Sequence, residues 1–152
     1  MRLQELFSAD DLLVDFRPLD KWNAIDSMMA SLRERGRVPE EIFADAHEAV
    51  LLRERSMSTG MERGVAIPHA AVDGLENAVA TMAIIPEEHE LAFESVDSSA
   101  TRIIVLLLIP RSQKLLHIRT LADVARGLGK EKIRHDLFGA TSNTVAWDAL
   151  GD

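Results

Sequence analysis

Two of the five histidines follow predicted strands, a position from which a side chain can do chemistry. His69 ends the apolar run Gly64–His69, in which Pro68 limits its own φ and stiffens the backbone before the imidazole. His117 lies in the opening turns of a predicted helix, soon after the apolar strand Arg102–Ile109. Because clefts in open α/β sheets form where strands end, we expect both imidazoles at such a cleft.

A nucleophilic imidazole that has no metal suits phosphoryl transfer. A ring nitrogen attacks phosphorus, and neighbouring groups position the phosphoryl group and neutralise its oxygens. Arg53 could supply that charge, and a second imidazole could donate a hydrogen bond. Ser58, Thr59 and the backbone amides near Gly60 could add further donors. Taken alone, Arg53 is typical of an exposed helix end, and Ser58–Gly60 of an ordinary turn.

Helical periodicity by itself favours a different interpretation of His117. This histidine shares a helix face with Leu121, Val124 and Leu128. Such a face is more typical of a partly buried, hydrogen-bonded histidine than of a functional one.

The remaining histidines and metal binding are less favoured. His47 and His135 lie in predicted helices among charged neighbours, and His89 lies in a loop, so all three are predicted to be solvated. A zinc site needs three or four ligands, whereas the chain has no cysteine and no HxxxH or HxH pair. We therefore expect neither a metal nor a cofactor.

The elements that must position these residues follow from hydrophobic periodicity and capping residues. Strands are predicted at Leu12–Phe16, Val65–Ile67, Val79–Ile85 and Arg102–Ile109, with a brief edge strand at Leu91–Phe93. Helices are predicted from an Asp20 N-cap to Gly36, from Pro39 to about Arg53, from a Ser112 cap to Gly129, and at Lys130–Phe138 and Thr144–Leu150. Since one strand is apolar without alternation, both of its faces should be covered. We predict one α/β domain over residues 1–152, with a mixed sheet between helices on both faces.

Three of these helices should each bury one apolar face. The inward residues are predicted to be Trp22, Ile25, Met29 and Leu32 in the first, Ile42, Ala46, Ala49 and Val50 in the second, and Leu115, Ile118, Leu121, Ala125 and Leu128 in the third.

The composition is that of a soluble globular protein. Of the 152 residues 47% are hydrophobic and 28% charged, and no run approaches the roughly 20 apolar residues that span a bilayer. The N-terminus lacks a signal-peptide core, and the absence of cysteine excludes disulfides, so we expect a cytoplasmic protein that is not embedded in a membrane. A net charge of −8 argues against nucleic-acid binding and permits a basic protein partner.

Together these motifs resemble a known family. The succession RE (Arg53–Glu54), STG (Ser58–Gly60), GVAIPH (Gly64–His69), an apolar strand ending LLLIP, and a histidine seven residues on is distinctive. It resembles the enzyme IIA domain of the bacterial phosphotransferase system, in the mannitol/fructose and nitrogen-regulatory class. The resemblance covers nearly the whole chain, including the segment Phe93–Asp97, and is closest to the regulatory branch.

The resemblance implies roles for three residues. His69 corresponds to the phosphoacceptor, His117 to a second histidine that supports the phosphoryl group, and Arg53 to an arginine that balances its charge. Family members receive phosphate from a small histidine phosphocarrier protein of the HPr type. They pass it to a IIB component, or regulate a target protein through their phosphorylation state.

Some positions depart from the family pattern. These are Ser56–Met57, Glu62–Arg63 and Ala70, which flank the site and remove no group that the chemistry requires. They put partner preference in question more than phosphoryl transfer.

The leading hypothesis is a phosphocarrier of the nitrogen-regulatory type. The chain shows no fused membrane or IIB segment, and its LLLIP ending is more typical of that branch. The alternatives are a sugar-specific IIA that feeds a separate IIB component, and a protein-interaction module that is not phosphorylated. A metal-dependent hydrolase is the least favoured hypothesis.

Overall fold

A buried strand, β5 (Ile103–Pro110), forms the centre of the sheet. The computed structural model describes residues 3–89, 91 and 100–151 of the chain. Within these residues the strand order is β1–β4–β5–β2, and β3 also pairs with β5. The other strands are β1 (Leu12–Leu13), β2 (Val65–Ala66), β3 (His69–Val72) and β4 (Val79–Ile84). Because β4 is antiparallel to β5 whereas β2 and β3 are parallel to it, the predicted mixed sheet is confirmed.

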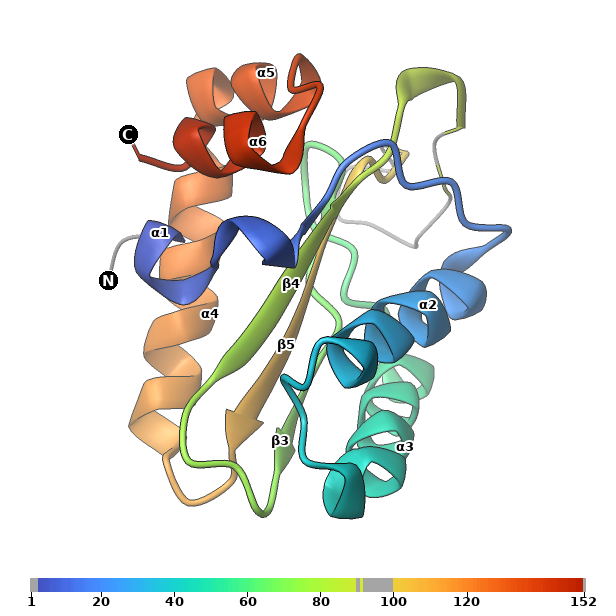
Figure 1. The fold of residues 1–152 in the computed structure, drawn as a ribbon, viewed down its shortest axis with the longest axis vertical. Coiled ribbons are helices and arrows are strands. Elements are labelled where there is room, and N and C mark those ends of the chain that lie inside the picture. Colours follow the sequence, from blue (N-terminus) through green and yellow to red (C-terminus); the bar gives the residue numbers. More distant parts are fainter. Residues whose placement is uncertain (1–2, 90, 92–99, 152) are drawn as a thin grey trace.

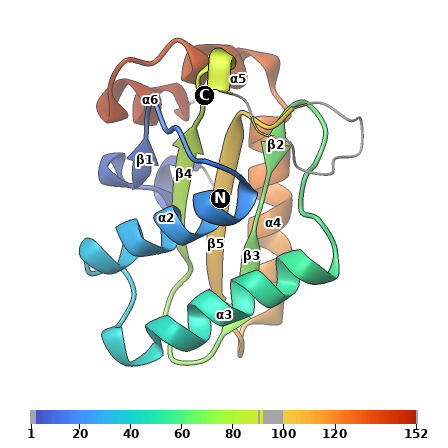
Figure 2. The ribbon, with the colours of Figure 1, turned by 90° about the vertical axis from the view of Figure 1, so that its right-hand side faces the viewer.

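Helices cover both faces of this sheet (Figures 1 and 2). One face packs against α2 (Lys21–Glu34) and α3 (Glu40–Ser56). The other carries α1 (Leu3–Leu6), α4 (Lys114–Leu128), α5 (Glu131–Phe138) and α6 (Asn143–Ala149).

Strand β5 contributes to both hydrophobic cores. Its odd-numbered residues from Ile103 to Ile109 belong to the cluster beneath α4, and its even-numbered ones, Ile104, Leu106 and Leu108, to the cluster beneath α2 and α3. Two covered faces explain why the strand is apolar without alternation, and the α/β prediction is confirmed. None of the helices in the described ranges is long and apolar enough to cross a bilayer.

Local capping signals position helix α2 as predicted. The Asp20 side chain accepts from the Asn23 amide at 2.8 Å, as an N-cap does. At the other end Gly36 has a φ of +69°, and the Arg37 amide donates to the Leu32 carbonyl at 2.9 Å. This left-handed glycine closes the helix.

The predicted inward face of α4 is wrong for Leu115 and Ile118 and right for Leu128, while Leu121 and Ala125 are partly buried. Leu115 and Ile118 are each 66% exposed, whereas Thr120, Val124 and Leu128 are buried. Apolar residues recur in α4 along two overlapping stripes of the helix. The sheet covers the stripe of Val124 and Leu128, on which Thr120 also lies. The side chains of Leu115 and Ile118 therefore remain at the surface.

The structure also differs from several predictions at single residues and at the ends of elements. Trp22 of α2 is 37% exposed, and Gln113 rather than Ser112 occupies the N-cap of α4, with no side-chain hydrogen bond. The first strand is shorter than predicted, since Asp15 adopts a positive φ of 57°. Leu91 pairs with Thr101 in an isolated bridge, whereas the rest of the predicted edge strand and the segment Phe93–Asp97 lie outside the described residues.

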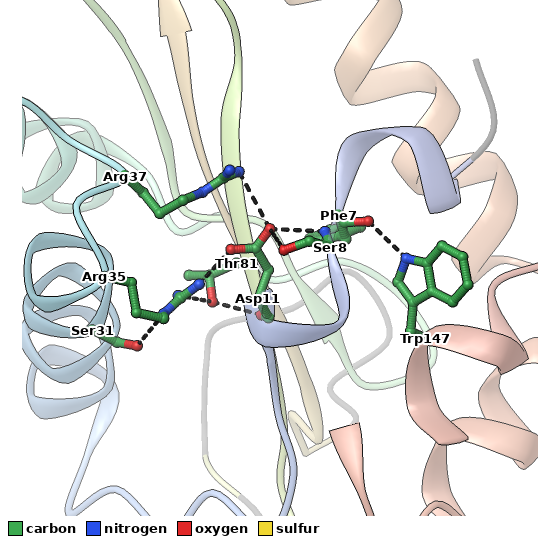
Figure 3. Close-up of polar contacts among 8 residues, drawn as sticks. All are labelled: Phe7, Ser8, Asp11, Ser31, Arg35, Arg37, Thr81 and Trp147. Atoms are coloured by element: carbon green, nitrogen blue, oxygen red, sulfur yellow. Dashed lines mark hydrogen bonds and ion pairs between the residues drawn. The ribbon is translucent and has the colours of Figure 1, made fainter. Parts of the chain in front are cut away.

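A buried polar cluster ties the N-terminal segment to β4 and to the end of α2 (Figure 3). The Asp11 carboxylate is fully buried and accepts from the Ser8 amide at 2.9 Å. It forms ion pairs with Arg35 at 2.5 Å and Arg37 at 3.3 Å. Thr81 donates to the Asp11 carbonyl at 2.7 Å and accepts from Arg35. We call these five residues the Asp11 cluster.

Candidate functional site

His69 and His117 come together although they are 48 positions apart in the sequence. Their ring centroids are 5.5 Å apart, and the rings are T-shaped with an interplanar angle of 77°. His69 begins β3, and His117 lies in the first turn of α4, which follows β5. Both side chains are partly exposed. The expected proximity of the two imidazoles is therefore confirmed.

The sequence predicted that His69 ends a strand, and this is wrong, because His69 is the first residue of β3. Strands β2 and β3 are one extended run along β5, interrupted at Pro68, which has no amide proton to donate to the ladder. The Pro68 carbonyl accepts from the Leu107 amide at 3.0 Å, and pairing resumes with His69 opposite Leu107. Since this run is the edge of the described sheet, the imidazole stays accessible although its backbone is held in the sheet.

The run begins at Gly64 for a steric reason. This residue has a φ of +77°, and a Cβ added there would lie 2.8 Å from the Ala100 carbonyl oxygen. Only glycine fits both conditions.

The protonation state of the His69 ring follows from its hydrogen bond. Nδ1 lies 2.7 Å from the Ile67 carbonyl oxygen, which can only accept, so Nδ1 carries the proton. Nε2 is left with the lone pair. Burial lowers the pKa of His69, and the charges of Arg53 and His117 act in the same direction, against the Ile67 hydrogen bond and the charge of Glu54. The neutral, nucleophilic form of the ring is therefore favoured near neutral pH.

A cavity of about 250 Å³ opens beside this ring. It is lined by Arg53, Ser58, Thr59, Gly60, Met61, Ile67, His69 and Leu121. Larger hollows of about 320 and 420 Å³ lie over α3 near His47 and beside the loop at Gly74, but neither is lined by a residue of the histidine pair. We therefore take the 250 Å³ cavity as the candidate active site, because His69, Arg53, Ser58 and Thr59 line it. His117 does not line the cavity and belongs to the site through its contact with the His69 ring.

Arg53 lies in the last turn of α3 and lines the cavity. Its Nη1 donates to the Met57 carbonyl at 2.8 Å, which closes the helix C-terminus over the turn that follows. Burial is the main cause of the lowered pKa of His69, and the positive charge of Arg53 acts in the same direction.

The two predicted hydroxyl donors differ in what they can offer. The Thr59 side chain donates to the Glu54 carboxylate at 2.5 Å, and its amide donates to the same carboxylate at 2.9 Å. The Ser58 hydroxyl accepts from the Gly60 amide at 3.2 Å. Thr59 is thus committed to shaping the turn, whereas Ser58 is a partly exposed residue that lines the cavity.

Two residues that organise the site were not predicted as site residues. Glu54 is only 2% exposed, and its carboxylate also forms an ion pair with Lys21 of α2 at 3.2 Å. The sequence identified Glu54 only as part of the RE motif. Lys21 has no local signal at all, because its partner lies 33 positions later in another helix.

The other histidines are less solvated than predicted. A ring nitrogen of His47 lies 2.7 Å from the Asp26 carboxylate, and one of His89 lies 2.6 Å from the Pro18 carbonyl oxygen. Only His135 is exposed as predicted. Among the described residues, no three histidine, cysteine, aspartate or glutamate side chains form a group that could hold a metal ion.

Comparison with known proteins identifies the class. The family model described as "Phosphoenolpyruvate-dependent sugar phosphotransferase system, EIIA 2" matches residues 5–151, and the chain belongs to this family. A "Nitrogen regulatory protein" of Escherichia coli (strain K12) is 30% identical over 115 residues, which cover 75% of this chain and 67% of that protein. A "PTS system fructose-specific EIIA component" of Haloferax volcanii is 27% identical over 135 residues, 89% of this chain and 85% of that protein.

A solved structure shares the fold. The nitrogen regulatory protein IIA-Ntr from Neisseria meningitidis superposes with a TM-score of 0.84 at 23% identity, over 97% of this chain and 98% of that one. The resemblance inferred from the sequence motifs is therefore confirmed.

Proposed function

We propose that the chain is a histidine phosphocarrier whose His69 accepts a phosphoryl group from a phosphorylated carrier protein of the HPr type. The observation that carries this proposal is the His69 ring, held by Nδ1 on the Ile67 carbonyl and facing His117 across 5.5 Å. The Nε2 lone pair attacks phosphorus as the P–N bond of the donor breaks, and the donor imidazole leaves with that electron pair. The chain is thus a phosphotransferase that works through a phosphohistidine.

The neighbouring residues take supporting roles in this proposal. His117 donates a hydrogen bond to a phosphoryl oxygen, and Arg53 neutralises the charge of the group from the other side of the cavity. The Ser58 hydroxyl supplies a further hydrogen bond. Thr59 acts through the shape of the turn rather than through its hydroxyl, because Glu54 already accepts that proton.

Exposed apolar side chains near the cavity support a protein as the phosphoryl donor. Leu52 and Met57, within four positions of Arg53 in the sequence, are 55% and 70% exposed, and Leu115 and Ile118, within two positions of His117, are each 66% exposed. Large apolar side chains left exposed next to site residues are typical of a protein-binding surface.

The charge of the two segments that carry Arg53 and His117 indicates which kind of protein surface would bind there. Residues 53–63 and 111–130 carry eight lysines and arginines against three acidic residues, although the chain as a whole has a net charge of −8. The basic partner that the net charge permitted does not match this local charge. An acidic docking patch on the carrier protein is the better match.

The regulatory branch is the favoured form of this proposal. A nitrogen regulatory protein and a fructose-specific EIIA component are both similar to this chain, so the sugar-specific role is the second candidate. We propose a cytoplasmic protein that acts as one IIA-like domain over residues 1–152, with no nucleic-acid partner. A regulatory target protein or a IIB component would read its phosphorylation state.

The decisive test is transfer of labelled phosphate from a phosphorylated HPr-type carrier, with the modified residue mapped by mass spectrometry. His69→Ala should abolish labelling without unfolding the protein, because the side chain is partly exposed. The exposed His135 provides the control, and His135→Ala should be labelled like the wild type. Labelling that persists in His69→Ala would overturn the assignment, and no labelling of the wild type would favour the unphosphorylated interaction module.

A second assay separates the two roles of a phosphocarrier. The labelled protein is incubated with IIB components of fructose and mannitol type. Transfer to one of them would favour sugar transport. Absence of transfer, together with a target protein bound in one phosphorylation state only, would favour regulation.

A further inference from the structure

Lys21 is connected to the wall of the candidate active site through an ion pair between two helices. It is the first residue of α2, and its Nζ lies 3.2 Å from Oε2 of Glu54, which follows Arg53 near the end of α3. The side chain of Lys21 is 16% exposed and that of Glu54 is fully buried. This pair therefore lies largely out of contact with water, where charge acts over longer distances than at a surface.

Glu54 connects this lysine to the wall of the cavity. Both of its carboxylate oxygens accept from Thr59, one from the amide and one from the hydroxyl. On its other side the turn is held by the edge strand, because the Ile67 amide donates to the Thr59 carbonyl at 3.1 Å. Oε2 lies against the Thr59 amide and the Lys21 ammonium, two groups that can only donate, so both contacts suit a carboxylate. The turn that lines the cavity is thus built on a buried negative charge.

A buried anion next to a phosphoryl site creates an electrostatic conflict. A phosphoryl group brings further negative charge into the cavity, and an uncompensated Glu54 would repel it. Glu54 already acts on the reacting ring, since its charge works against the lowering of the pKa of His69. The other charged or titratable groups that act on this ring are Arg53 of α3 and His117 of α4.

We propose that Lys21 is a positioning residue of the phosphoryl site, which neutralises Glu54 so that the turn at Thr59 can rest on a carboxylate without repelling the phosphoryl group. This inference rests on the proposed function. It adds a second cation to the site besides Arg53, one that acts through Glu54 and does not touch the phosphoryl group. A lysine that only braced α2 against α3 would contribute to stability and leave the electrostatics of His69 unchanged.

Proton titration of His69 followed by NMR separates these two roles and needs no phosphate. Lys21→Met should raise the pKa of His69, because Glu54 is then an unneutralised anion. Lys21→Arg keeps the charge and should leave the pKa at its wild-type position. Glu54→Gln should lower it, because the Glu54 charge, which acts to raise the pKa of His69, is then removed. The double variant Lys21→Met/Glu54→Gln carries neither charge and should return close to the wild type.

Phosphoryl transfer provides the second readout. At a fixed ratio of phosphorylated to free donor, the labelled fraction of Lys21→Met should fall by about three- to tenfold at equilibrium, and Lys21→Arg should restore it. If Lys21→Met leaves both the His69 titration and the labelled fraction unchanged, the proposal is overturned.

The outcome stays decisive if one variant folds poorly. Should Lys21→Met unfold, Glu54→Gln and the double variant still test whether the two charges act on His69 in opposite directions. If the variants shift the pKa of His69 as predicted but the wild type takes no label, the phosphocarrier function is rejected and the electrostatic coupling between Lys21, Glu54 and His69 stands. If the wild type is labelled but the variants leave the pKa of His69 unchanged, the phosphocarrier function stands and the proposed role of Lys21 is rejected.

Discussion

Asp11 and Glu54 are both buried carboxylates with basic partners, yet they differ in what surrounds them. Asp11 has two arginines, Arg35 and Arg37, and its remaining contacts are to the folded scaffold of the N-terminal segment (Figure 3). Glu54 has one lysine, Lys21, and its remaining contacts shape a turn that lines an open cavity. Asp11 thus forms ion pairs with two cations, whereas the ion pair described for Glu54 is with one.

The two carboxylates hold opposite ends of the same helix. Lys21 is the first residue of α2, and Arg35 follows its last residue, so about 21 Å of helix separates the two ion pairs. This comparison suggests a division of roles. The Asp11 cluster fixes the helix to the sheet, and the Glu54 pair uses the fixed helix to bring a balancing charge to the site.

The largest expected effect comes from breaking the Asp11 cluster. Asp11→Ala leaves two arginines partly buried without their carboxylate and should cost about 3–5 kcal/mol in the free energy of unfolding, measured by urea titration. Labelling of His69 in the folded fraction should be unchanged, because the cluster does not line the cavity. The exposed ion pair between Asp136 and Lys132 gives the control, and Asp136→Ala should change stability by no more than about 0.5 kcal/mol. Equal losses in the two variants would contradict the fastening role of Asp11.

The sequence predicted those parts of the fold that depend on neighbouring residues. The Asp20 cap, the Gly36 stop and the apolar β5 each follow from local chemistry, and each was confirmed. His69 and His117 could also be found, because each follows a strand or a strand-like run that leads to the same place.

What the sequence did not predict depends on contacts between distant residues. Arg35 and Asp11 are 24 positions apart, and no pattern near either one indicates the other. The prediction for the first two turns of α4 was wrong for a related reason. Leu115 and Ile118 fit a helical stripe as well as Val124 does, and only the position of the sheet decides which stripe is buried.

Glu54→Gln should give the opposite signature, with a smaller loss of stability and a change at the site. Glutamine has the size of glutamate and keeps an oxygen for Thr59, whereas Asp11→Ala removes every polar atom of the side chain, so we expect a smaller loss of about 1–2 kcal/mol in the free energy of unfolding. The equilibrium labelling of His69 should change, whereas in Asp11→Ala it should not. If Glu54→Gln proved as costly as Asp11→Ala and left labelling unaltered, the two carboxylates would have the same structural role.

The smallest expected effect is the dependence of stability on pH that His69 contributes. Burial holds the pKa of His69 below its ordinary value of 6.5, so in the unfolded chain the ring takes up a proton at higher pH than in the folded protein. Its contribution should be constant above pH 6.5, decrease as the pH falls toward the pKa of the folded state, and level off below it. Urea titrations of the wild type and His69→Ala between pH 8 and 5 measure this as a difference that shrinks with acidity. The same decrease should remain in Asp11→Ala, whose His69 is unaltered. A difference in the free energy of unfolding that stays flat or grows as the pH falls would mean that the folded protein does not lower the pKa of His69. The proposed link between the Glu54 pair and a neutral, nucleophilic His69 would then be lost.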